Sequence, residues 1–196
     1  IKVVKKNEKI CKYFDIPIQH ISDSVLKRMN RKSNSESIEL LIKKLREKIP
    51  NVIIRTTVMV GFPGETQEDF EKLCNFVESA KFDKLGAFAY SKEEGTPAAK
   101  LKEQVHPMTK KARYNKIMEI QQKVSEENLN KYIGKELEVL VEGKTIDGKY
   151  YVCRSYMDVP DIDGLIYLNN SKELKIGDFV KCTIKSSINE YDLLGE

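Results

Sequence analysis

Cysteine is scarce in this chain, and its spacing excludes the common cysteine-based metal sites. The four cysteines are Cys11, Cys74, Cys153 and Cys182. No two of them form a C-x-x-C pair, so we expect the chain itself to hold neither zinc nor an iron–sulfur cluster. The only histidines, His20 and His106, have no neighbouring cysteine pair. We interpret both as surface or hydrogen-bonded side chains.

Long apolar runs are missing too. No window approaches the ~18 consecutive apolar residues of a transmembrane helix, and no apolar stretch near the start resembles a signal peptide. Isolated thiols without an export signal favour the cytoplasm. The chain of 196 residues begins Ile1-Lys2-Val3 without a methionine, and we expect it to be a piece of a longer protein.

Residues 1–90 alternate between strand-like and helix-like patterns. Strands are predicted at residues 13–18, 52–60 and 84–90, and helices at residues 35–48 and after Thr66, with Asp69 completing a capping box. Residues 52–60 (VIIRTTVMV) are rich in β-branched side chains without alternation, which is typical of a parallel strand buried on both faces. Since ~8 strands close a complete barrel, three strands predict an incomplete parallel β/α barrel.

The rest of the chain changes character. A helix is predicted at about residues 109–132, and five short apolar runs separated by turns follow it. We therefore divide the chain into an α/β part (residues 1–108), a connecting helix (109–131) and a small antiparallel OB-like β-barrel (132–196). Residues 1–131 contain 26 Lys and Arg against 18 Asp and Glu, whereas residues 132–196 contain 8 against 12. The two parts thus carry +8 and −4.

Polar residues follow or interrupt the predicted strands where α/β folds bind ligands. Gln19 and Ser22 come after the first strand, and Tyr90 ends the third. Arg55 shares one face of the second strand with Thr57 and Met59 if side chains alternate. A buried arginine needs a partner, so we expect it either to contact a ligand or to form a salt bridge near the strand end. The plainer interpretation of the segment after the first strand is an ordinary polar loop.

Two further segments have alternative interpretations. Residues 61–66 (GFPGET) join a strand to a capped helix, and their glycines allow backbone N–H groups to approach a carboxylate or phosphate. They lack the Gly-Lys-Ser/Thr of a P-loop, so a tight turn is the simpler explanation. Residues 27–32 (KRMNRK) form a basic run that would suit RNA phosphates, although a solvated face is the commoner case.

Three longer strings together are more specific than any single motif. They are residues 13–31 (YFDIPIQHISDSVLKRMNR), 55–66 (RTTVMVGFPGET) and 87–98 (AFAYSKEEGTPA). They resemble the later barrel strands of the radical S-adenosylmethionine methylthiotransferase family, and the remainder is similar to the TRAM domain of that family. Residues 154–164 (RSYMDVPDIDG) resemble the branch that modifies an aspartate β-carbon of a small-subunit ribosomal protein.

The resemblance implies S-adenosylmethionine and two [4Fe–4S] clusters in the full-length enzyme. It also implies that Gln19, Ser22, Arg55 and Tyr90 form the later half of the cofactor pocket. The family's cluster ligands are absent from this chain, so we expect the chain to be inactive alone. Catalytic residues are not assigned.

Charge supports the same branch of the family. An acidic barrel with Asp158, Asp161 and Asp163 in one loop suits a basic ribosomal protein better than a nucleic acid, although a solubilising loop would look alike. The alternatives are a tRNA adenosine methylthiotransferase, a non-enzymatic RNA- or protein-binding module, and an unrelated α/β enzyme.

Overall fold

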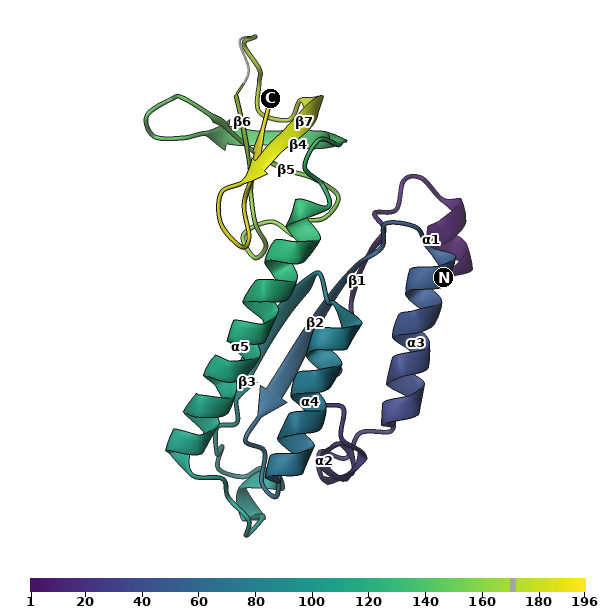
Figure 1. Cartoon of the computed structure of the whole chain (residues 1–196), viewed down its shortest axis with the longest axis vertical. Helices are drawn as coiled ribbons and strands as arrows, with labels where there is room; N and C mark the ends of the chain where they lie inside the picture. Colours follow the sequence, from purple (N-terminus) through teal and green to yellow (C-terminus); the bar gives the residue numbers. More distant parts are fainter. Residues whose placement is uncertain (170–171) are drawn as a thin grey trace.

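The computed structural model describes residues 1–169 and 172–196 and contains an α/β part and a small β-barrel joined by one long helix (Figure 1). The α/β part is a three-stranded parallel sheet with the order β1-β2-β3. Its strands are β1 (Tyr13–Asp15), β2 (Ile53–Val60) and β3 (Lys84–Ala89). The prediction of an incomplete parallel β/α barrel followed by an OB-like barrel is confirmed.

Strand β1 is shorter than predicted because its register with β2 shifts by one residue between the pairs Asp15–Arg55 and Gln19–Val58. The Ile16 N–H still donates to the Arg55 carbonyl at 2.9 Å, and the chain rejoins β2 at an isolated bridge between Gln19 and Val58. The segment after β1 is therefore attached to the sheet up to Gln19.

Five α-helices and one 3₁₀ turn accompany the sheet and the barrel in the described residues. They are α1 (Lys2–Lys6), α2 (Asp23–Arg28), α3 (Ser35–Lys48), α4 (Gln67–Ala80), η1 (Ala98–Lys100) and α5 (Pro107–Asn130). Helix α3 has the predicted bounds, because an apolar stripe and an Asn34 cap both define it. Helix α5 begins two residues earlier than predicted, since His106 caps it and Pro107 fits its first turn.

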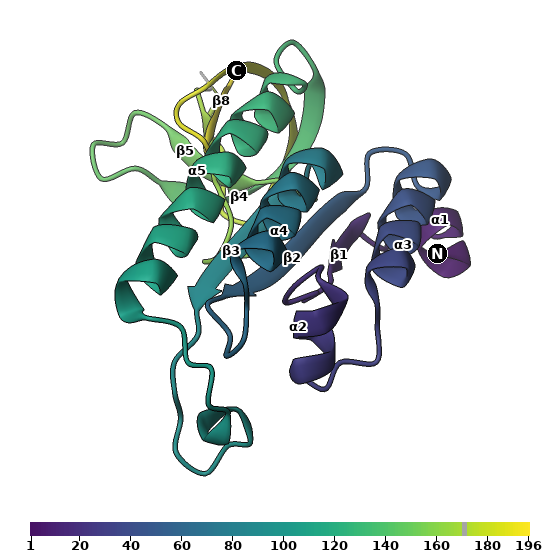
Figure 2. The same cartoon turned by 60° about the horizontal axis from the view of Figure 1, so that its bottom comes forward.

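The helices cover one face of the sheet. Ile42 of α3, Leu73 of α4 and Ile117 of α5 pack in one core with Ile54 and Val58 of β2. Figure 2 shows α3, α4 and α5 on the same side of the strands. The opposite face of β2 is only partly buried and does not take part in this core; at its carboxyl end, Met59 packs against a small cluster that includes Val25 of α2.

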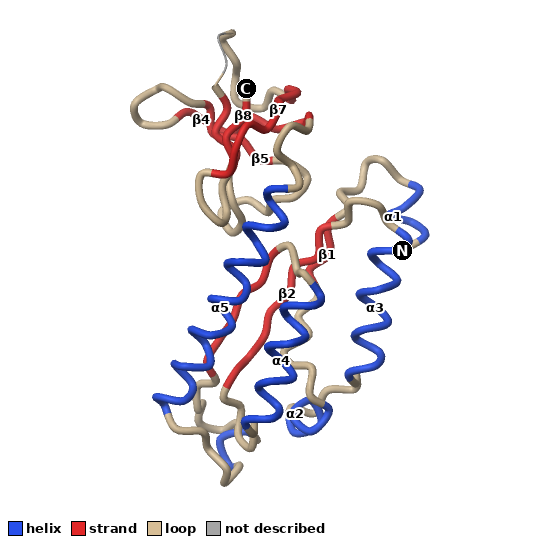
Figure 3. The backbone as a smooth tube through the Cα atoms, viewed as in Figure 1, coloured by secondary structure: helices blue, strands red, loops and turns tan. Residues whose placement is uncertain are grey.

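The second part is a group of short strands at one end of α5 (Figure 3). They form a closed barrel with the order β4-β5-β6-β8-β7. Its strands are β4 (Glu136–Lys144), β5 (Tyr151–Arg154), β6 (Ile166–Leu168), β7 (Phe179–Ser187) and β8 (Leu193–Gly195). All five apolar runs form strands. The expected all-antiparallel pairing needs one correction, because β6 and β8 are parallel. Strand β8 closes the barrel between β6 and β7, and it runs in the same direction as β6.

The barrel sits at the amino ends of the sheet strands. Ile53 of β2 and Leu129 of α5 belong to the same buried cluster as Val139, Ile166 and Ile184 of the barrel. The two parts are therefore joined by packed side chains as well as by α5.

No helix in the described ranges is long and apolar enough to cross a membrane.

Candidate functional site

The partly buried face of the sheet carries the residues that the alternation of β2 predicted. Arg55, Thr57 and Met59 are half-buried, while the residues between them are buried under the helices. Their register partners on β3 are Lys84, Gly86 and Phe88. The prediction that Arg55, Thr57 and Met59 share one face is confirmed.

Gln19 lies at the carboxyl end of this face. Its backbone φ is 70°, and its N–H and carbonyl bond to β2 through the Thr57 carbonyl at 2.9 Å and the Met59 N–H at 2.7 Å. Within the described chain, the Gln19 side-chain amide makes no hydrogen bond. It is held in place by its backbone and keeps both amide groups available.

Tyr90 lies at the same end, because its N–H donates to the Val60 carbonyl at 2.9 Å. Its ring packs edge-on against Phe62 with centroids 5.2 Å apart, and the Lys110 ammonium lies 4.8 Å from its centroid. The Tyr90 hydroxyl is buried and has no partner in the described residues. A buried hydroxyl without a partner is costly, so this oxygen is suited to a group that the chain does not supply.

Ser22 is buried and its hydroxyl is already engaged. It donates to Asp69 of α4 at 2.5 Å, and Ser24 donates to the same carboxylate oxygen at 2.7 Å. Burial alone would raise the pKa of Asp69, but the hydrogen bonds from Ser22, Thr66 and Ser24 outweigh it and hold that pKa well below its ordinary value. Ser22 therefore anchors the segment after β1 to the start of α4.

The two histidines are hydrogen-bonded, as interpreted from the sequence. His20 is fully buried, its Nδ1 accepts from the Ser22 N–H at 2.9 Å, and burial lowers its pKa to about 4. His106 is exposed, and its Nδ1 accepts from the Met108 N–H at 3.2 Å.

Arg55 is separated from Gln19 and Tyr90. It lies near the amino end of β2, five positions before Val60, which corresponds to about 16 Å along a strand. Its guanidinium contacts Asp15 at 2.6 Å and Asp163 at 3.9 Å. The salt-bridged alternative thus describes Arg55 in this structure: it lies on the partly buried face of the sheet, but at the other end of β2 from Tyr90.

The GFPGET loop binds a carboxylate of its own. Glu65 is buried and accepts hydrogen bonds from the N–H groups of Gly61 and Phe62. Arg113 of α5 donates to the other Glu65 oxygen and to the Glu65 carbonyl, both at 3.1 Å. Burial raises the pKa of Glu65, and the nearby Arg113 charge opposes that rise. Gly61 has a φ of 72°, which a glycine adopts without strain. The backbone N–H groups of the loop that would suit a phosphate therefore already bind the Glu65 carboxylate.

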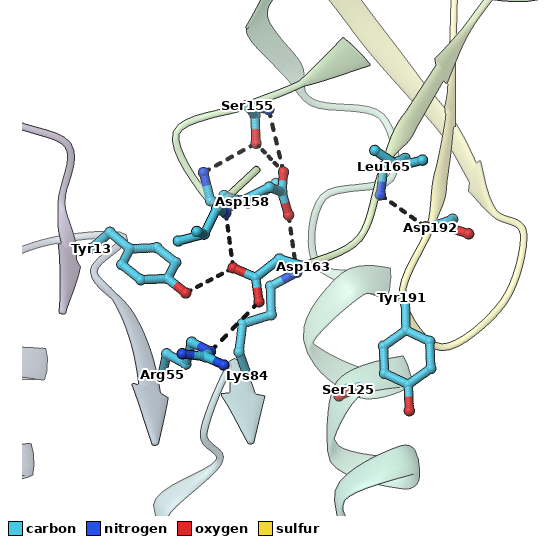
Figure 4. A network of polar contacts seen from close by, with 12 residues as sticks. Tyr13, Arg55, Lys84, Ser125, Ser155, Asp158, Asp163, Leu165, Tyr191 and Asp192 are labelled. Carbon is cyan, nitrogen blue, oxygen red and sulfur yellow. Dashed lines mark hydrogen bonds and ion pairs between the residues drawn. The ribbon is translucent and has the colours of Figure 1, made fainter. Parts of the chain in front are cut away.

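The aspartate loop of the barrel faces the sheet instead of the solvent (Figure 4). Asp158 pairs with Lys84 of β3 at 3.0 Å, and Asp163 accepts from the Tyr13 hydroxyl at 2.7 Å. Their side chains are only 6% and 4% exposed, whereas Asp161 is exposed. This corrects the expectation of a docking loop made by all three aspartates, because two of them are used to join the barrel to the sheet.

The polar contacts at this junction perturb the Tyr13 hydroxyl. Burial raises the pKa of Tyr13, and the hydrogen bond to Asp163 raises it further. Tyr13 therefore stays protonated and keeps donating to Asp163 at any ordinary pH. In Figure 4, Tyr13, Arg55 and Lys84 converge from β1, β2 and β3 on the loop that carries Asp158 and Asp163.

The residues of this chain fit the implied cofactors to different degrees. Within the described ranges, no three His, Cys, Asp or Glu side chains are grouped to hold a metal ion, so they do not fit an iron–sulfur cluster. The carboxyl end of the sheet does fit part of a site for a polar small molecule. Its features are the available Gln19 amide and the unpartnered Tyr90 hydroxyl.

Sequence reasoning missed the contacts of two buried carboxylates, Glu65 and Asp69. Arg113, the partner of Glu65, lies four residues before Ile117 on the apolar stripe of α5. That position indicates a buried arginine, which needs a partner. Asp69 was seen only as a helix cap, and its contact with Ser22 joins positions 47 apart in sequence.

Comparisons with known proteins agree with this architecture. The Radical SAM superfamily model matches residues 1–77, and the TRAM domain model matches residues 133–196. The chain is 61% identical over 197 residues to the ribosomal protein uS12 methylthiotransferase RimO of Alkaliphilus oremlandii, covering 100% of this chain and 45% of that protein. Proteins of the same name from Thermoanaerobacter sp. and Lachnoclostridium phytofermentans are 53% and 48% identical, each with 44% of its length covered.

The chain thus spans less than half the length of these curated relatives. Among solved structures, the radical SAM enzyme coproporphyrinogen III oxidase of Escherichia coli matches 55% of this chain and 25% of its own. That match has a TM-score of 0.44 and 22% identity, which is too distant to carry an argument.

Proposed function

The chain belongs to the radical SAM methylthiotransferase family and carries a TRAM domain, and from this premise we propose that it forms the carboxyl-terminal part of a ribosomal protein uS12 methylthiotransferase. The proposed reaction adds a methylthio group to the β-carbon of an aspartate of that small-subunit protein, in the cytoplasm. The observation that carries the proposal is 61% identity along the whole chain to an enzyme named for that activity. The named relatives give no support to a tRNA substrate.

The geometry of the sheet supports a cofactor-binding role for its carboxyl end. In a radical SAM enzyme, the bound cofactor supplies hydrogen-atom abstraction from an unactivated carbon. We propose that the Gln19 amide hydrogen-bonds to a polar group of S-adenosylmethionine, and that Tyr90 forms part of the pocket wall. Ser22 and Arg55 have positioning roles in this proposal, since Asp69 and Asp163 already engage them.

The small barrel has the proposed role of contacting the substrate protein. The charge of −4 over residues 132–196 suits a basic ribosomal protein, and Asp161 remains exposed at its surface. The buried Asp158 and Asp163 fix the orientation of the barrel relative to the sheet.

A chimeric enzyme tests the proposed function directly. The matching segment of the Alkaliphilus oremlandii enzyme is replaced by this chain, and the product is incubated with the ribosomal protein, S-adenosylmethionine and a reductant. We expect uS12 to gain the mass of one methylthio group in place of one hydrogen, at a single aspartate. The unaltered Alkaliphilus enzyme is the matched control.

The same experiment separates the alternatives. A chimera that folds and holds its clusters but leaves uS12 unmodified contradicts the proposal. If that chimera instead modifies a tRNA adenosine, the chain belongs to the other branch of the family.

Within an active chimera, Gln19→Ala is expected to raise the KM for S-adenosylmethionine, because uniform binding of the cofactor is lost.

A further inference from the structure

A groove lies between the edge strand β3 and the first turns of α5. It has a volume of about 660 Å³. Three lysines and three aromatic residues line it, and they are Phe88, Tyr90, Lys92, Lys110, Lys111 and Tyr114. We call it the lysine–aromatic groove. Among the described residues, no aspartate or glutamate lines it, although Glu93 and Glu94 follow Lys92 in the loop.

The lysines of the groove are available to an anion. Lys92 and Lys111 are exposed, and neither forms an ion pair within the described chain. Lys110 is half-buried, and its ammonium donates to the Tyr90 carbonyl at 2.9 Å, which holds it at the wall of the groove. Three positive charges without opposing carboxylates make a surface that attracts phosphate groups.

The aromatic residues distinguish this groove from a simple cationic patch. Phe88 is 59% exposed and Tyr114 is 37% exposed, so both rings are accessible from solvent. The two rings flank the edge strand: Phe88 belongs to β3, where it shares the face of Gly86 that α5 does not cover, and Tyr114 belongs to α5. Exposed rings beside lysines are the pattern of single-stranded nucleic acid sites, where bases stack on the rings and the backbone follows the charges.

We propose that the lysine–aromatic groove binds a short stretch of single-stranded RNA. Stacking favours RNA over an acidic peptide, because a peptide would use the lysines and leave Phe88 and Tyr114 without a role. The proposal is independent of the methylthiotransferase activity, so either can fail without the other. Gln19 and the junction at Asp163 do not line the groove, whereas Tyr90 borders both the groove and the proposed cofactor pocket.

Fluorescence anisotropy on this chain with a labelled mixed-sequence RNA of about 12 nucleotides tests the proposal. Binding to a single strand should weaken with salt, with a slope of log K against log salt of about −2 for three lysine–phosphate contacts. The double variant Lys92→Gln, Lys111→Gln should reduce the slope to about −0.7. Phe88→Ala and Tyr114→Ala should each weaken binding at least about fivefold.

A matched control has the same charge change elsewhere. Lys43 and Lys44 are exposed on α3 and form no ion pair in the described chain, so Lys43→Gln, Lys44→Gln should leave the slope nearly unchanged. Equal losses in both double variants would mean non-specific attraction and would overturn the proposal. So would absent RNA binding, or a polyglutamate peptide that binds as tightly as RNA with no effect of the aromatic variants.

Discussion

Glu65 is a buried carboxylate, and hydrogen bonds from three groups offset the loss of its hydration. Two backbone N–H groups of its own loop and the Arg113 guanidinium surround it. The Glu65 side chain is 0% exposed and that of Arg113 is 8% exposed, so water contributes little. A buried pair of this kind stabilises the fold little more than two apolar residues in its place would, but removing one partner leaves the other charge buried and unpaired.

Arg113→Met is therefore expected to lower the free energy of unfolding by about 3–5 kcal/mol at neutral pH. Removing Arg113 raises the pKa of Glu65 further above its ordinary value. Between the ordinary and the raised pKa, the folded chain holds a proton that the unfolded chain does not, so stability falls as pH rises. The deficit of the variant should shrink in mildly acid buffer, which urea unfolding followed by circular dichroism measures.

Lys116→Met on the same helix is the matched control for this change. Lys116 pairs with Glu119 at 3.2 Å, but both side chains are about half exposed, so the loss should stay below about 1 kcal/mol. Similar losses in the two variants, or a deficit in Arg113→Met that does not change with pH, would contradict the buried-pair account.

At the scale of elements, helix α4 begins with a cap that also holds the neighbouring segment. Thr66 and Asp69 exchange the bonds of a capping box, as the sequence predicted. Asp69 additionally accepts from the hydroxyls of Ser22 and Ser24. One carboxylate therefore fixes both the start of α4 and the path of the chain that follows β1.

Asp69→Asn is expected to destabilise the fold by about 1.5–3 kcal/mol at neutral pH, because hydrogen bonds to a charged acceptor are lost. Since the pKa of Asp69 is lowered in the folded state, its contribution is complete above the ordinary aspartate pKa. That contribution disappears as pH falls through the lowered value. The wild-type chain should thus lose stability in acid more steeply than the variant.

Thermal unfolding across acid and neutral buffers measures this difference. Glu68→Gln removes an exposed charge from the same turn, where Glu68 pairs with Lys72, and serves as the control. Parallel pH curves for wild type and Asp69→Asn would show that Asp69 is not the group that titrates.

Elements with two local signals were predictable from the sequence, and elements with one were less so. Helix α3 has both a cap and an apolar stripe, and its bounds were predicted correctly. Strand β1 has only an apolar run, and its regular ladder with β2 ends early, at Asp15. Strand pairing around the barrel has no local signal, so the parallel β6–β8 pair was not foreseen.

The candidate site was harder to predict than the fold. Gln19 and Tyr90 lie at the same end of the sheet, because residues that follow parallel strands all lie at the carboxyl ends of those strands. Arg55 pairs with Asp15, its register neighbour on β1, but it also approaches Asp163, which lies more than a hundred residues away and which no strand rule places there. A loop that looks like a solvated acidic surface in sequence is the same loop that buries two aspartates.

At the scale of the whole molecule, the relative placement of barrel and sheet depends on that loop. Lys84 is 13% exposed and pairs with Asp158, while Tyr13 bonds to Asp163. These contacts surround an apolar junction that includes Ile53. Because each partner lies on a different unit, the contacts couple the stability of the barrel to that of the sheet.

The double variant Asp158→Asn, Asp163→Asn should weaken this coupling. Each asparagine keeps nearly the same volume but removes a charge, which leaves the Lys84 ammonium partly buried without its counter-ion. Hydrogen–deuterium exchange should then become faster in residues 155–164 and in β1, while α3 keeps its protection. Asp161→Asn lies in the same loop with an exposed side chain and is the matched control. Faster exchange in that single variant, or unchanged exchange in the double variant, would mean that apolar packing alone holds the barrel on the sheet.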